Sequence, residues 1–424
     1  MDIIGLIGVI ISWGERLFKA IKKFFEWRTQ GSIKSYKKRF AKGMQTIIDN
    51  RDKAVRLLYN YYASSNTKHD AVYTIRYLYE DGHSRDMALI TRPNLVLTKN
   101  PNFKIDSVYG GPISHFSFPK NELTSGKKKW DALGIIAYEG HKYSLYSVSE
   151  NGTLEFRDTT FHTYRATFGE IYDEFVMTVA DKGIDKLKNY SQSKQRSLLP
   201  LRKKYLGSLD RILDLHQRIC AGGVITMFAA RTPDDVVIYA QKRSAIVSDE
   251  PNLYTLVPRA FHESLISPTD EFNLETTIYR ECYEELFKGE MKIGDHVEHD
   301  FYLSEKPGIR DLVAGKGVNH TLKPTALLWD LYRGNFIVTY CLYVHDQTWY
   351  AKYGNELTLN WEYASENKTA ARASRSEVLG LLNRNDWAQD SYFAFVEGLR
   401  WLSAQEPLME SFNSKLPKLI FSRI

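Results

Sequence analysis

Four long apolar runs set the strongest limit on what this chain can fold into. They cover residues 222–231, 236–244, 324–332 and 335–346 and are rich in β-branched and aromatic residues. The turn segment TPDD separates the first two, and such runs form the strands of a buried sheet. Residues 374–384 and 390–402 follow with apolar residues at helical spacing. This order predicts an α/β fold, an α/β/α sandwich with a mixed sheet between helices.

The rest of the chain divides by pattern into three further parts. Residues 1–65 predict a basic amphipathic helical segment, and residues 66–166 predict a small β-rich domain, because short alternating runs are separated by turn signals. Residues 167–218 predict a helical connector. We therefore expect the sandwich to occupy residues 219–424.

Composition is that of a folded protein, with 43% apolar and 25% charged residues in 424. The three cysteines, Cys220, Cys282 and Cys341, are far apart and form no C-x-x-C pair. This pattern argues against a disulfide framework and a zinc ribbon, and it favours a reducing compartment. We therefore expect a cytoplasmic protein.

The positive charge is concentrated at the N-terminus. Residues 1–50 hold ten Lys and Arg against four Asp and Glu, and this excess of +6 equals the net charge of the whole chain. The remaining residues are therefore neutral overall. Proteins that bind nucleic acid through their main domain more often carry basic surface there, so we expect no nucleic-acid partner.

An amphipathic helix is predicted within residues 1–28. The apolar run at 3–13 is shorter than the roughly 20 residues needed to span a bilayer. Apolar residues then recur at helical spacing with lysines between them, as in helices that lie at a membrane surface. The same pattern suits packing on a partner protein, on the chain itself or on a second copy in a homo-oligomer. A peripheral position at the inner face of the membrane is one expectation, and a protein contact is the other.

The segment IYRECYEELFK, residues 278–288, gathers three glutamates beside an arginine. On a helix Glu281, Glu284 and Glu285 lie within about 100° of one another, and Arg280 can pair with Glu284 at i, i+4. Carboxylates this close repel unless a cation neutralises them, and oxygen donors suit Mg²⁺ or Mn²⁺. A solvated helix face is the simpler alternative. The sharper one is a metal site that binds phosphates.

This segment resembles the Nudix hydrolase family. The family signature is G-x5-E-x7-R-E-U-x-E-E-x-G-U, with U aliphatic, and its second half matches residues 280–285. The resemblance implies that Glu281, Glu284 and Glu285 bind the metal and that Arg280 orients them. It also implies a nucleotide-type substrate and covers roughly residues 219–405.

The chain departs from the signature at three places. Phe272 occupies the position of the upstream glutamate, and Phe287 replaces the glycine after the glutamate pair. The segment VPRAFHE, residues 257–263, lies where the family often has a P-G-G loop, with Arg259 and Ala260 at the glycines. The metal-binding core is therefore retained while the turn glycines are lost.

Three residues outside the glutamate segment are candidates for substrate binding. Arg243 ends the second strand beside Lys242 and could bind phosphate. Arg259 and His262 lie in the V-P loop. For His262, a loop histidine without a role in binding is the alternative.

Two functions of different classes follow from these patterns. The first is metal-dependent hydrolysis of a nucleoside diphosphate linked to another group, or of a related nucleotide. The second is a catalytically weak module that senses a nucleotide and regulates the N-terminal half. A membrane-associated scaffold is a weaker third.

Overall fold

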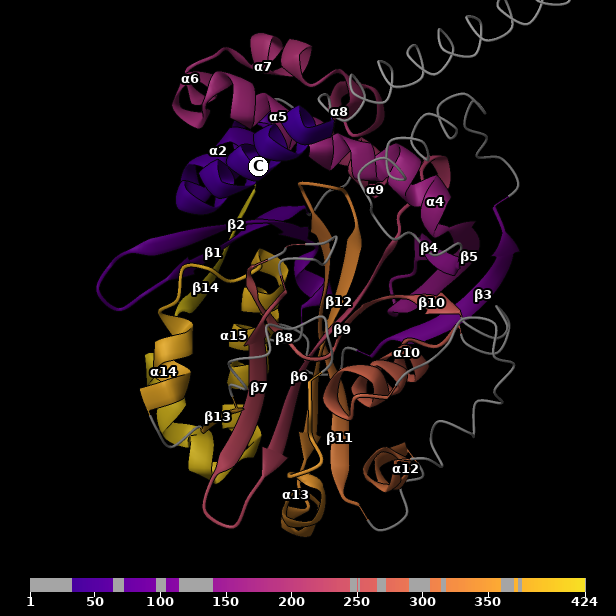
Figure 1. Ribbon diagram of the computed structural model, residues 1–424, viewed down its shortest axis with the longest axis vertical. Coiled ribbons are helices and arrows are strands. Elements are labelled where there is room, and N and C mark those ends of the chain that lie inside the picture. The colour runs from indigo at the N-terminus through magenta and orange to yellow at the C-terminus, as the bar shows by residue number, and fades with distance from the viewer. Residues whose placement is uncertain are drawn as a thin grey trace, which may run out of the picture.

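The computed structural model describes residues 33–63, 72–96, 104–113, 140–244, 250, 252–264, 272–289, 306–313, 318–359, 370–372 and 376–423. The predicted amphipathic helix of residues 1–28 lies outside these residues. The described part of the chain is a mixed α/β structure, as the apolar runs predict (Figure 1).

A ten-stranded sheet is the largest element of the described residues. Its main path runs β13-β7-β6-β12-β11-β2-β1-β14, with β8 paired to β7 and β9 paired to β6. The strands are β1 (Tyr73–Leu78), β2 (Ser84–Thr91), β6 (Gly222–Arg231), β7 (Val236–Lys242), β8 (Tyr254–Leu256), β9 (Arg259–Phe261), β11 (His320–Asp330), β12 (Phe336–Val344), β13 (Ala370–Arg372) and β14 (Lys418–Arg423).

The centre of this sheet confirms that it is mixed. Strands β6 and β12 pair in parallel, with Gly222 opposite Phe336, whereas β11 pairs antiparallel with β12. The four apolar runs that predicted strands thus form β6, β7, β11 and β12.

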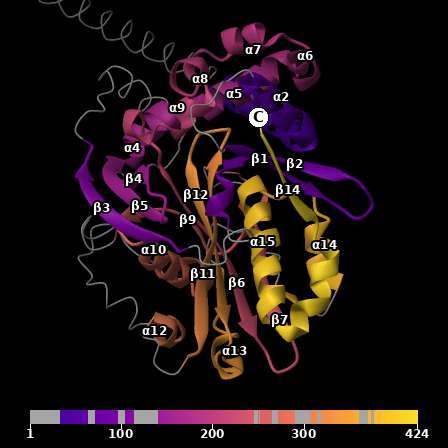
Figure 2. The ribbon, with the colours of Figure 1, turned by 180° about the vertical axis from the view of Figure 1, so that it is seen from behind.

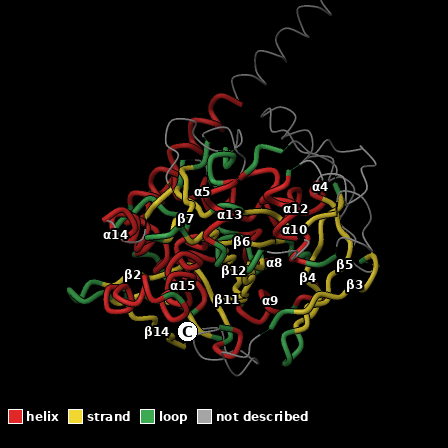
Figure 3. Tube along the Cα trace, turned by 90° about the horizontal axis from the view of Figure 1, so that it is seen from below, coloured by secondary structure: helices red, strands yellow, loops and turns green. Residues whose placement is uncertain are grey.

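Helices cover both faces of the central strands. On β6, Val224 and Phe228 belong to a core that includes Ile278 of α10 (Leu274–Glu281). The alternate residue Met227 belongs to a second core with Phe395 of α15 (Gln389–Gln405). Successive side chains of a strand point to opposite faces, so α10 and α15 lie on opposite sides of the sheet (Figure 3).

A smaller four-stranded sheet lies beside the large one, in the order β10-β4-β5-β3. Its strands are β3 (Asp106–Pro112), β4 (His141–Val148), β5 (Thr153–Thr160) and β10 (Glu263–Ser264). The strands expected between residues 66 and 166 are therefore divided between the two sheets. β1 and β2 belong to the large sheet, whereas β3, β4 and β5 belong to the small one. The domain boundaries themselves stay a prediction, but the division between the sheets does not follow them.

The connector of residues 167–218 is helical, as expected, and lies at one end of the large sheet beside α2 (Figures 1 and 2). Further helices are α2 (Arg51–Tyr62), α4 (Phe161–Tyr164), α5 (Glu170–Lys182), α6 (Ile184–Lys188), α7 (Gln192–Leu198), α8 (Pro200–Tyr205), α9 (Leu209–Leu213), α12 (Pro307–Val313), α13 (Gln347–Tyr353) and α14 (Ser376–Leu382). Residues 33–49 are also helical.

Two sequence-based expectations concern the whole chain. The three cysteines are buried and unbridged in the structure. Within the described ranges, no helix is both long and apolar enough to cross a bilayer.

Candidate functional site

The glutamate segment is held against the sheet by its apolar stripe. Helix α10 begins after Asn273, whose side chain accepts a hydrogen bond from the Glu275 N–H at 2.9 Å. Ile278, Cys282 and Leu286 are fully buried, as their spacing predicts. This anchoring fixes which side of the segment turns toward the V-P loop.

The segment is not one regular α-helix, which corrects the predicted geometry. Helix α10 ends at Glu281, and residues Cys282–Leu286 form a π-helical turn. A π turn holds more residues than an α turn, so it spaces Glu284 and Glu285 differently from the i+3 and i+4 positions of an α-helix. Such turns are frequent at functional sites.

Arg280 holds two of the three glutamates, as the i, i+4 spacing predicts for one of them. It is 1% exposed and donates to Glu281 Oε1 at 3.1 Å and to the Glu263 carbonyl oxygen at 3.1 Å. Its Nε lies 3.6 Å from Glu284 Oε1. A buried guanidinium thus fixes these carboxylates. The Glu284 side chain is 26% exposed, against 10% for Glu281, so Glu284 is the more accessible of the two.

The third glutamate is bound by the V-P loop. Glu285 is 1% exposed, and its Oε2 accepts a hydrogen bond from the Arg259 backbone N–H at 2.8 Å. Arg259 begins β9, which pairs with β6 and so presents this N–H to the helix. The loop that resembles the P-G-G position therefore does contact the glutamate segment.

Glu281, Glu284 and Glu285 offer the carboxylate oxygens that Mg²⁺ and Mn²⁺ prefer, and the Arg280 guanidinium contacts two of them. In the side-chain arrangement seen here, no three Asp, Glu, His or Cys residues of the described chain are grouped so that they could hold a metal ion. The donor chemistry of the segment fits a hard divalent cation, and each carboxylate has a protein contact that orients it.

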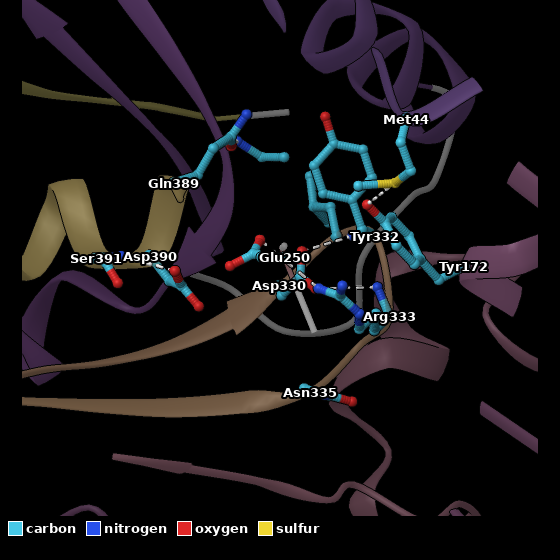
Figure 4. A network of polar contacts seen from close by, with 12 residues as sticks. Met44, Tyr172, Glu250, Asp330, Tyr332, Arg333, Asn335, Gln389, Asp390 and Ser391 are labelled. Carbon is cyan, nitrogen blue, oxygen red and sulfur yellow. Dashed lines mark hydrogen bonds and ion pairs between the residues drawn. The ribbon is translucent and has the colours of Figure 1, made fainter. Parts of the chain in front are cut away.

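Arg259 contacts Glu285 through its backbone, and its side chain belongs to an ionic network that the sequence did not predict. Its guanidinium contacts Glu250 at 2.6 Å and Asp390 at 2.9 Å. Arg333 in turn lies 3.9 Å from Glu250 and 3.5 Å from Asp330 (Figure 4). Arg259 begins β9, Asp330 ends β11 and Arg333 lies in the turn that follows it. Glu250 lies in a loop, and Asp390 lies at the start of α15. Only the three-dimensional fold brings them together.

Burial raises the pKa of one carboxyl group in this network, that of Asp330. Loss of solvent raises the pKa of Asp330 to about 6, although Arg333 opposes the shift. The Asp330 carboxylate also accepts hydrogen bonds from the backbone N–H groups of Tyr332 at 2.8 Å and Arg333 at 3.2 Å. The one sequence signal for the Asp330–Arg333 pair was the D-x-x-R spacing after an apolar run. This spacing is too common to identify a site.

The other two candidates for substrate binding, His262 and Arg243, are largely buried. His262 is fully buried, with Nδ1 2.8 Å from Thr277 Oγ1 and Nε2 2.9 Å from the Phe272 carbonyl oxygen. Desolvation lowers its pKa to about 3, so the ring is neutral and acts as a link within the core. Arg243 is 7% exposed and its backbone pairs with Leu253.

Comparison with known proteins adds no relative. A scan against protein-family models found no match, and a search of curated proteins found none either. The resemblance to the Nudix family thus stands on the residues of the glutamate segment and its flanking strands.

Proposed function

We propose that the glutamate segment binds Mg²⁺ or Mn²⁺ and supports hydrolysis of a phosphoric anhydride bond in a nucleotide. The observation that carries this proposal is the buried Arg280, which contacts Glu281 at 3.1 Å and lies 3.6 Å from Glu284. The resemblance to the R-E-x-x-E-E motif implies the same arrangement. Helices on both faces of a mixed sheet further support a Nudix-like sandwich.

The residues would divide the work as follows. Glu281, Glu284 and Glu285 would hold the cation, and Arg280 and the Arg259 backbone N–H would position their carboxylates. A bound cation would neutralise phosphate oxygens and lower the pKa of a water molecule that attacks phosphorus. Glu284 is the best residue to test, because its side chain is the more accessible of the two that Arg280 holds.

The test is product release from a panel of nucleotides with Mg²⁺ or Mn²⁺, with the wild type beside Glu284→Gln. We expect the variant to lose at least about 100-fold in kcat, because loss of a metal-ligand charge removes transition-state stabilisation. Glu410→Gln, which changes an exposed glutamate in the 3₁₀ segment Pro407–Lys415, is the matched control and should match the wild type. Equal turnover in the wild type and Glu284→Gln would defeat the proposal.

A second candidate is nucleotide sensing without turnover. The observation that favours it is Arg259, which replaces a loop glycine of the family and is held by Glu250 and Asp390. Phe272 also occupies the upstream glutamate position, and its carbonyl oxygen is engaged by His262. Calorimetric binding of a nucleotide with no product over several hours would favour sensing, whereas metal-dependent product formation would exclude it.

A further inference from the structure

The helical connector contains a cavity of about 430 Å³ with a strongly basic lining. It lies among α7, α8 and α9, at the end of the large sheet where α2 also lies (Figure 1). The described residues that line it are Arg196, Ser197, Pro200, Lys203, Lys204 and Arg211. None of these six is acidic, so four cationic side chains border one space without a carboxylate in the lining. Like charges repel one another, and a bound anion would relieve that repulsion.

The protein itself does not neutralise most of this charge. Within the part of the chain that the structure describes, Arg196, Lys203 and Arg211 form no ion pair with a carboxylate. The carboxylate of Glu174 on α5 does contact α8, but it accepts hydrogen bonds from two backbone N–H groups at the start of that helix, at 2.7 and 3.0 Å. Glu174 therefore caps α8 and leaves the positive charge of the cavity unbalanced.

The two arginines of the cavity are held in place by backbone carbonyl oxygens. Arg196 Nη2 donates to the Tyr61 carbonyl oxygen at 3.3 Å, and its guanidinium lies 5.4 Å from the centre of the Tyr61 ring. Arg211 Nη1 donates to the Lys204 carbonyl oxygen. A guanidinium has five N–H donors, so each arginine keeps donors for a ligand. One of them, Nε of Arg196, is buried and has no hydrogen-bond partner among the described residues.

We propose that this cavity binds a small group that carries more than one phosphate, either free in solution or as the headgroup of a membrane lipid. Its volume lies within the usual range for small-molecule sites. Arginines bind phosphate oxygens through paired N–H donors, and lysines supply point charges. Four cations exceed the charge of a single phosphate ester, which is at most about −2 at neutral pH, so the match is to two or more phosphates.

The lining offers nothing that would hold a nucleobase. Its uncharged members are Ser197 and Pro200, and none of the six residues is aromatic. Proteins that bind bases without sequence preference usually stack them on aromatic rings. The Ser197 hydroxyl is itself engaged, because it donates to the Lys194 carbonyl oxygen at 2.8 Å. Recognition here therefore depends on phosphate charge, and the site does not require the glutamate segment to bind metal.

The first experiment is calorimetric titration of the full chain with inositol trisphosphate, whose phosphates are monoesters and are not consumed by anhydride hydrolysis. Lys203→Gln and Arg211→Gln should each weaken binding by about 10-fold, because each removes one charge-assisted contact. The Lys203 side chain is exposed, so its replacement should leave the fold intact. Lys186→Gln is the matched control, because Lys186 is exposed on α6 and does not line the cavity. Both Lys186→Gln and Glu284→Gln should bind as the wild type does, which separates this site from metal-dependent hydrolysis.

Co-sedimentation with vesicles separates the two sources of the phosphates. Phosphatidylcholine vesicles would contain either phosphatidylinositol bisphosphate or phosphatidylserine, at the same total charge. Preference for the bisphosphate vesicles that is lost in Lys203→Gln would assign the site to a lipid headgroup. Binding of inositol trisphosphate without such a preference would assign it to a free ligand. No binding of either probe by the wild type, or wild-type affinity in both Lys203→Gln and Arg211→Gln, would overturn the proposal.

Discussion

Arg280 shows how much a single residue of this chain reveals from sequence. Its pairing with Glu284 followed from i, i+4 spacing, and the structure places the two groups 3.6 Å apart. Its burial to 1% exposure and its bond to the Glu263 carbonyl oxygen did not follow, because they depend on β10 lying against the helix. Local pairs are encoded by spacing, whereas burial is decided by distant segments.

His262 is the residue for which pH gives the sharpest test. Its folded pKa of about 3 lies below the value of about 6.5 in an unfolded chain. Below pH 6.5 the unfolded state therefore binds the extra proton, so the stability that the neutral ring contributes is complete above that pH and is lost as pH falls. We expect the advantage of the wild type over His262→Gln to shrink by about 1.4 kcal/mol per pH unit between pH 6 and 4.

The measurement is the free energy of urea unfolding of both proteins at several pH values. The difference in unfolding free energy between the two proteins is needed, because Asp330 changes stability with pH in the opposite direction to His262. The pKa of Asp330 is raised to about 6, so the folded state binds the extra proton between pH 4 and 6. That contribution is common to both proteins and cancels. Parallel stability curves for the two proteins would show that His262 does not titrate as its burial requires.

At the scale of elements, the apolar stripe of the glutamate segment was predictable and its helix type was not. Ile278, Cys282 and Leu286 face the core as their spacing indicates. The π turn at Cys282–Leu286 has no sequence marker, since the same residues satisfy an α-helical pattern. Contact with β9 and the Arg259 N–H is the added constraint that local sequence does not contain.

Strand β9 should be sensitive to its contact with β6. A Cβ atom at Gly223 would lie 2.7 Å from Phe261 Cα and still closer to the Ala260 carbonyl oxygen, so Gly223→Ala would push β9 away. We expect a loss of about 1–3 kcal/mol in the free energy of unfolding. The same displacement should move the Arg259 N–H from Glu285 and reduce metal-dependent turnover.

Gly380→Ala is the matched control, measured beside it by urea unfolding. Gly380 lies inside α14, and its Cβ atom would meet nothing within 4 Å. Alanine favours helix over glycine by up to about 1 kcal/mol, so this variant should be equal to or more stable than the wild type. If Gly223→Ala were equally harmless, the close approach of β9 to β6 would not support the glutamate site.

At the scale of the whole molecule, the division of the sequence into parts differs from the division of the strands between the two sheets. The runs at residues 70–91 predicted strands correctly, but their partners are β11 and the C-terminal β14. No local pattern states which strand pairs with which, because such pairing is set by the complementary faces of distant segments. The ionic network was unpredictable for the same reason, since Glu250, Asp330 and Asp390 are far apart in sequence and are joined through Arg259 and Arg333 only by the tertiary fold.

This sheet order makes a prediction about dividing the chain. Ile75, Met87 and Leu89 are at most 1% exposed and pack in the core that α15 covers. A chain of residues 219–424 would lose them and would leave β11 and β14 with unpaired edges. Exposed sheet edges and apolar surface favour aggregation. We therefore expect this fragment to elute from size exclusion as aggregate, without the cooperative thermal unfolding of the full chain.

Removal of residues 418–424 alone is the matched comparison. It takes away only β14, whose residues are partly or largely exposed, and leaves β1 and β2 in place. This shorter loss should lower the melting temperature while the protein stays monomeric, because one edge strand contributes less than a shared core. A monomeric 219–424 fragment that unfolds cooperatively would show that the C-terminal part is an independent unit. The N-terminal strands would then be an addition to its sheet and not a requirement for it.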